Sequence, residues 1–104
     1  MPWIYLTFAG LLEIVWATAM KQSDGFSRLT PTLITGVAMV ASVWLLALAM
    51  RALPLGTSYM VWTGIGAVGA FVVGVVYLGE AVTPLRLGAA VMIVGGIGLM
   101  KLAG

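Results

Sequence analysis

The sequence contains no cysteine and no histidine, and only 8% of its 104 residues are charged. Without cysteine the chain has no disulfide and no thiolate ligand. Without histidine it lacks the side chain that most often serves as a general base or a zinc ligand. These absences exclude thiol redox chemistry and soft-metal sites. We therefore expect no enzymatic activity, no cofactor and no metal site.

What the chain has in abundance is apolar side chains. Hydrophobic residues make up 62% of the sequence, and the mean hydropathy is +1.17, which is outside the balance of a soluble domain with a polar surface. A spanning helix needs about 20 apolar residues, so a chain of this length accommodates four. The net charge of +2 comes from few groups and is typical of membrane-flanking cations. The sequence predicts an all-α membrane protein surrounded by lipid, with no nucleic-acid partner.

Polar residues and turn signals divide the chain into four apolar segments. The polar stretch 21–28 separates the first two and contains the turn signal Asp24-Gly25. Thr30-Pro31 and Thr83-Pro84 each combine a helix N-cap with a first-turn proline. We expect a single four-helix transmembrane domain over residues 1–104, with helices at about 2–20, 31–52, 57–78 and 84–102.

The cations are divided almost equally between the two sides of the membrane that four spans define. Arg51 and Lys101 fall on the side of the termini, and Lys21, Arg28 and Arg86 fall on the other, two against three. Because an excess of cations orients a membrane protein, this balance favours insertion in both orientations. Two copies could then pair head to tail, as an antiparallel, dual-topology homodimer.

Glu13 is a carboxylate in the middle of the apolar run 2–20. A charged side chain at the centre of a spanning helix costs on the order of 3 kcal/mol, so it marks a functional site. Four helices cannot both surround a polar site and shield it from lipid, which is a second reason to expect a dimer.

Two polar side chains are candidates to contact Glu13. Trp16 lies one helical turn away on the same face and offers one indole N–H donor; a lipid-facing tryptophan is the alternative. Ser42 lies near the middle of the second span and can donate to a carboxylate, although a hydrogen bond back to its own helix is equally compatible with its position.

Tyr59 and Trp62 form a pair three residues apart at the start of the third span, where they resemble the wall of a cavity; an interfacial aromatic belt is the alternative. Aromatic faces attract weakly hydrated cations, and Glu13 supplies the opposite charge. A single carboxylate holds a proton or a cation but not both, and this competition suffices for exchange transport if the site faces one side at a time.

Glycines in the fourth and third spans suggest a dimer interface and a hinge, respectively. Gly88 and Gly95 are seven residues apart in the fourth span, and small residues allow close approach of helices in membranes, so we expect the dimer interface there. Gly64 and Gly66 predict a hinge in the third span. The alternative for Gly88 and Gly95 is that glycine is simply common in membrane helices.

Taken together, these stretches resemble the small multidrug resistance (SMR) family of transporters over essentially the whole chain. The matching residues are Glu13, the stretch 21–29 (KQSDGFSRL), the stretch 52–66, Gly79-Glu80 and the pair Gly88 and Gly95. The resemblance implies four transmembrane helices, an antiparallel dimer, a multi-pass location in the bacterial cytoplasmic (inner) membrane, and proton-coupled export of small cations.

Within this family, Glu13 followed by Trp16 resembles the guanidinium exporter branch, and Lys101 fits it as well. The resemblance implies that Glu13 binds substrate and proton, that Trp16 and Ser42 brace Glu13, and that Tyr59 and Trp62 shape the pocket. Guanidinium is planar and weakly hydrated, and it donates two parallel hydrogen bonds to a carboxylate.

Met60 departs from the family pattern, which usually has a small residue there, and a flexible thioether at the pocket mouth could change the substrate range. Lipid contact is its alternative role.

Other functions are compatible with parts of the sequence. A polyspecific exporter of quaternary ammonium and other multidrug cations is the main alternative. A proton-carrying rotor subunit also uses one helical carboxylate but is usually a two-helix hairpin, and a purely structural membrane subunit would need no Glu13. The sequence leaves open the physiological substrate, the exchange stoichiometry, and whether a paralogue replaces one copy of the dimer.

Overall fold

The computed structural model describes residues 2–103, which form four α-helices joined by short connections and contain no strand. The helices are α1 (Pro2–Gln22), α2 (Leu29–Ala49), α3 (Leu55–Tyr77) and α4 (Pro84–Ala103). Each is long and apolar enough to cross a membrane. The expected all-α, four-helix membrane architecture is therefore confirmed.

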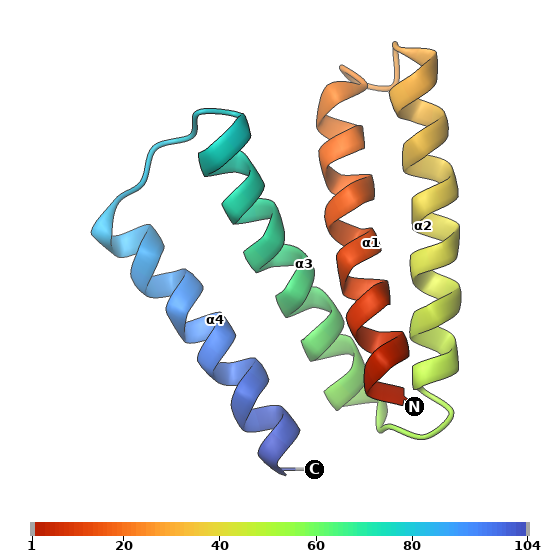
Figure 1. Cartoon of the computed structure of the whole chain (residues 1–104), viewed down its shortest axis with the longest axis vertical. Coiled ribbons are helices and arrows are strands. Elements are labelled where there is room, and N and C mark those ends of the chain that lie inside the picture. Colours follow the sequence, from red (N-terminus) through yellow and green to blue (C-terminus); the bar gives the residue numbers. More distant parts are fainter. Residues whose placement is uncertain (1, 104) are drawn as a thin grey trace.

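The helices lie side by side in the order α2, α1, α3, α4, with α1 and α3 running in the same direction and α2 and α4 in the opposite one (Figure 1). α1 packs closely against both α2 and α3, whereas α2 and α3 meet only slightly, and α4 packs along α3. The Cα atoms occupy a slab of 41 × 34 × 16 Å. The chain is therefore flattened in one direction, and no other helix of the described chain covers the broad faces of this layer (Figure 1).

The helix starts agree with the sequence in one case and differ in another. At α4, the Thr83 hydroxyl accepts a hydrogen bond from the backbone N–H of Arg86 at 3.1 Å, so Thr83 is the expected N-cap and Pro84 the first helical residue. At α2 the expected Thr30 cap is wrong: the helix begins at Leu29, and the N-cap Arg28 makes no side-chain capping bond. Pro31 still lies in the first turn, where backbone N–H groups lack helical partners, so the helix can start two residues before it.

The connections at the two ends of the bundle differ in shape. Between α1 and α2, Asp24, Gly25 and Phe26 all have positive φ, which confirms the predicted Asp24-Gly25 turn. α2 ends at Ala49, earlier than the expected Ala52. Residues 50–53, between α2 and α3, still form turns through backbone hydrogen bonds to the last residues of α2. Residues 2 and 103 lie at the same end of the bundle (Figure 1).

A small apolar core lies between α1, α2 and the first half of α3. It consists of side chains that are at most 7% exposed, namely Leu6, Ala9, Leu46, Ala49 and Val61. In contrast, α4 has no buried residue among those described. The chain therefore has a packed side formed by α1 to α3 and, at its edge, a helix that packs along α3 without burying a residue.

Candidate functional site

Glu13 lies on the side of α1 that faces α3, and only 9% of the residue is exposed. Its carboxylate lies directly against the backbone of Gly66, where a Cβ atom would overlap Oε1 and the carboxyl carbon. The absence of a side chain at position 66 therefore provides the space that the carboxylate occupies.

Two further glycines bring α1 and α3 close together above and below this point. A Cβ atom on Gly10 would lie 2.6 Å from Cγ2 of Ile65, and one on Gly69 would overlap the Ile14 side chain. Each glycine of one helix thus receives an isoleucine of the other. This close fit encloses Glu13 in apolar surroundings at the centre of the α1–α3 interface.

Ser42 is fully buried and joins three helices through two hydrogen bonds. Its hydroxyl donates to the backbone carbonyl of Ala9 on α1 at 2.6 Å and accepts the indole N–H of Trp62 on α3 at 3.0 Å. The single hydroxyl proton is thus committed to Ala9 and not to the Glu13 carboxylate. Within one chain, Ser42 neither braces Glu13, as the family resemblance implies, nor bonds back to its own helix.

Tyr59 and Trp62 stack against each other with ring centroids 5.5 Å apart and an interplanar angle of 49°. Trp62 is half-buried, while 53% of Tyr59 is exposed. With its indole N–H held by Ser42, Trp62 offers its aromatic ring to a neighbouring cation but no free donor. The pair lies on the first turns of α3, about one to two turns before Gly66.

Trp16 is half-buried, and its indole nitrogen is fully enclosed yet has no hydrogen-bond partner within residues 2–103. Ser58, one turn before Trp62, is in the same condition: it is fully buried and its hydroxyl has no partner in that part of the chain. Sequence reasoning missed Ser58, although its spacing of four residues from Trp62 placed it on the same helical face.

Met60 faces away from Glu13. It is 59% exposed and lines an apolar groove of about 440 Å³ between α3 and α4, together with Tyr59 and with Met92 and Met100 of α4. Glu13 does not line this groove. Tyr59 therefore joins the two regions, because it lines the methionine groove and also packs against Trp62.

Gly64, one of the two expected hinge residues, contacts α4. A Cβ atom there would lie 2.8 Å from Cδ1 of Ile97, so the missing side chain allows α4 to approach α3. α3 is a continuous helix from Leu55 to Tyr77. The bend near Gly64 and Gly66 stays a prediction, while both glycines make close contacts in this conformation.

Gly88 and Gly95 point into open space, with no atom of the described chain within 4 Å of a Cβ at either position. They lie on the side of α4 away from the α3 groove, which Ile93, Gly96 and Ile97 line. The expected dimer interface at these two glycines is therefore unobstructed by the chain itself.

The comparisons with known proteins agree with this architecture. The model of the family described as Small Multidrug Resistance protein matches residues 1–100. A protein of Escherichia coli (strain K12) named guanidinium exporter is 57% identical over 103 residues, which cover 99% of this chain and 98% of that protein. A guanidinium exporter of Yersinia pseudotuberculosis serotype I (strain IP32953) is also 57% identical, over 99% of both chains.

A third relative, the guanidinium exporter of Citrobacter freundii, is 54% identical over 99% of this chain and 98% of its own. The family model and the relatives both extend over almost the whole sequence, including all four helices and the Glu13 interface. This chain belongs to the small multidrug resistance family.

Proposed function

We propose that this chain exports guanidinium, and small substituted guanidinium-like cations, in exchange for protons, and that the two compete for Glu13. The observation that carries the proposal is an acidic side chain enclosed between two apolar helices, in a chain whose relatives are named guanidinium exporters. As a family member with four spanning helices, the chain is a multi-pass protein of the bacterial cytoplasmic membrane.

The chemistry of guanidinium fits the groups near Glu13. Its planar fork of N–H donors matches the two oxygens of a carboxylate, and its weakly hydrated faces stack on aromatic rings. The Tyr59–Trp62 pair supplies such rings on the helix that packs over Glu13. The cation therefore finds its counter-charge and an aromatic surface on two adjacent helices, and we expect transport without chemical conversion of the substrate.

The shape of the chain supports a second copy as partner. In this thin slab, one side of the α1–α3 pair and the outer face of α4, which carries Gly88 and Gly95, have no protein neighbour in the described chain. Because a carboxylate in lipid is costly, a second copy that covers this side would complete the site. We infer an antiparallel homodimer that brings two Glu13 carboxylates to one cavity and faces one side of the membrane at a time.

Purified protein in liposomes tests the proposal directly. An imposed guanidinium gradient should drive proton movement, and lowering the pH should weaken guanidinium binding because protons occupy the same carboxylate. Glu13→Gln removes the group that both ions share and should abolish coupled exchange, whereas Asp24→Asn, in the exposed connection between α1 and α2, should leave it intact. Undiminished exchange by Glu13→Gln would contradict the assignment.

A polyspecific quaternary ammonium exporter is the second candidate, and the groove beside Tyr59 favours it. The methionine side chains that line this groove are flexible and apolar, so they suit bulky substituents of varied shape. The same liposomes separate the candidates. Currents with guanidinium and none with a bulky aromatic ammonium support the first, and the reverse result supports the second.

A further inference from the structure

The connection between α3 and α4 is held in one conformation by contacts that run back onto α3. Residues 78–83 are not helical, and Gly79 has a φ of +71°, the left-handed conformation that ends helices and favours glycine. The backbone N–H of Glu80 then donates to the carbonyl of Gly74 at 2.9 Å. The chain therefore turns back, and Glu80 lies over the last turns of α3.

The Glu80 side chain lies on the surface that Gly74 leaves free. A Cβ atom at position 74 would lie 2.7–2.8 Å from the atoms of the Glu80 carboxyl group. Gly74 is itself buried. The carboxylate is thus placed against the α3 backbone by a glycine, as Glu13 is placed against Gly66.

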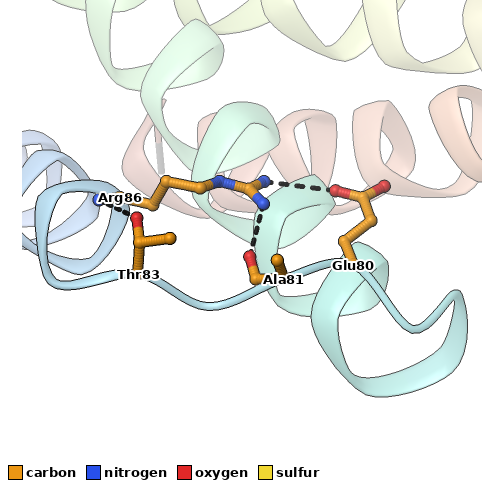
Figure 2. Close-up of polar contacts among 4 residues, drawn as sticks. All are labelled: Glu80, Ala81, Thr83 and Arg86. Atoms are coloured by element: carbon orange, nitrogen blue, oxygen red, sulfur yellow. Dashed lines mark hydrogen bonds and ion pairs between the residues drawn. The ribbon is translucent and has the colours of Figure 1, made fainter.

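The side chain of Arg86, in the first turn of α4, binds this carboxylate and the backbone carbonyl of Ala81 (Figure 2). Nη2 lies 3.2 Å from Oε1 of Glu80, and Nη1 donates to the carbonyl of Ala81. The guanidinium carbon also lies 5.1 Å from the centre of the Phe71 ring on α3. We call Phe71, Gly74, Glu80, Ala81 and Arg86 the loop clamp.

The clamp lies beside the N-terminal cap of α4. The Thr83 hydroxyl caps the helix through the backbone N–H of Arg86, the same residue whose side chain reaches Glu80 and Phe71. The side chain of Arg86 therefore attaches the first turn of α4 to the last turns of α3, through Phe71 directly and through Glu80, which lies against Gly74.

Few other contacts hold α4. In the part of the chain described, it has no buried residue and packs along α3, where Gly64 receives Ile97. Near its C-terminal end, Nζ of Lys101 lies 5.6 Å from the centre of the Trp3 ring on α1. A six-residue connection without the clamp would let the loop end of α4 swing about these contacts, since an exposed segment with few contacts opens at little cost.

We propose that the loop clamp makes α3 and α4 move as one arm when the site changes sides. The inference rests on the proposed function, because α3 carries Gly66, Tyr59 and Trp62 and α4 carries the proposed dimer seam. With the clamp intact, movement of the α3 wall of the pocket is transmitted to α4. With the clamp broken, guanidinium still binds, but the change of side is slower.

The expected effect is moderate and salt-dependent. The side chains of Arg86 and Glu80 are 41% and 45% exposed, so dissolved salt screens their attraction. An ion pair of this kind changes an equilibrium by up to about fivefold. We expect Glu80→Gln to slow exchange about fivefold and to remove the salt dependence of the clamp.

Arg86→Lys tests the geometry separately, because lysine keeps the charge but lacks the planar fork that reaches the carboxylate and the Ala81 carbonyl together. It should behave like Glu80→Gln. The matched control is Asp24→Asn, which removes an exposed carboxylate from the other connection at the same end of the bundle. Asparagine tolerates the positive φ of this residue, so the control should exchange normally.

The decisive experiment measures guanidinium binding by calorimetry, exchange in liposomes, and a spin-label distance between cysteines at the exposed positions 76 and 85. The chain has no native cysteine to interfere. Support requires unchanged binding, slower exchange and a broader distance distribution in both clamp variants but not in Asp24→Asn.

Unchanged exchange, an unchanged distance distribution, or binding that falls in parallel with exchange would each overturn the proposal. If the wild-type protein does not exchange guanidinium at all, the proposed function fails. The label distances would still decide whether the clamp holds the two helices together.

Discussion

At the scale of single residues, the surroundings of Glu13 depend on side chains that are absent. Gly66 gives the carboxylate its space, and Gly10 and Gly69 let the flanking isoleucines fill the rest of the interface. A glycine in a helix costs up to about 1 kcal/mol relative to alanine. Here the cost is offset by a fit that no larger residue permits.

Gly66→Ala should therefore disrupt the site specifically. The added methyl group overlaps the Glu13 carboxylate, and overpacking of this kind costs about 1–3 kcal/mol. We expect guanidinium binding, measured by calorimetry, to fall by about tenfold or more.

The control for this substitution is Gly36→Ala in α2, where a Cβ atom meets nothing within 4 Å. It should bind guanidinium normally and unfold at an equal or higher temperature, because alanine favours the helix. Normal binding by Gly66→Ala would show that Glu13 does not need its position against α3.

For Ser42, the sequence predicted a buried polar role but not the groups to which its hydroxyl bonds. Its polar side chain in the middle of an apolar span indicated a buried role, and the structure confirms the burial. Its acceptor is a backbone carbonyl, that of Ala9. Every residue except the chain ends offers such a carbonyl, so only the packing of α1 against α2 selects this one.

At the scale of helices, α3 joins the α1–α2 pair to α4. One side carries the contacts to Glu13 and Ser42, and the other carries the groove and the contacts to α4. Its glycines serve both sides, because Gly66 receives Glu13 and Gly64 receives Ile97. A substitution on the α4 side should therefore act on helix packing without touching the carboxylate.

Gly64→Ala tests this separation. Its methyl group would lie 2.8 Å from Cδ1 of Ile97, so we expect lower thermal stability in detergent by about 1–3 kcal/mol. Ile97→Val removes the atom that collides, and the double variant should recover most of the loss. Additive losses would mean that the Gly64–Ile97 contact does not set the distance between α3 and α4.

At the scale of the whole molecule, the chain is a thin layer with one helix, α4, that buries nothing. A protein that stays monomeric would leave the outer face of this helix and the broad faces of the layer to lipid. The near-equal division of cations between the two ends permits a second copy in the opposite orientation. The antiparallel dimer remains a proposal that these features support.

The seam at Gly88 and Gly95 gives this proposal a direct test. Replacing both glycines with leucine adds bulk where the helices of two copies would touch, and we expect crosslinking in the membrane to lose the dimer. Val94→Phe is the control, because it adds bulk one residue from Gly95, about 100° around the helix, at a position that is also exposed. A dimer that survives the glycine replacements would place the interface elsewhere.

The sequence by itself determined the membrane class, the four helices and Glu13 as the residue to explain. These features depend on apolar runs and on the cost of a charge in lipid, both of which are local properties. Only the tertiary structure decided that Gly66 receives Glu13, that Ser42 binds Ala9 and Trp62, and that Arg86 binds Glu80. Such contacts depend on the rotation and spacing of packed helices, which hydropathy along one chain does not specify.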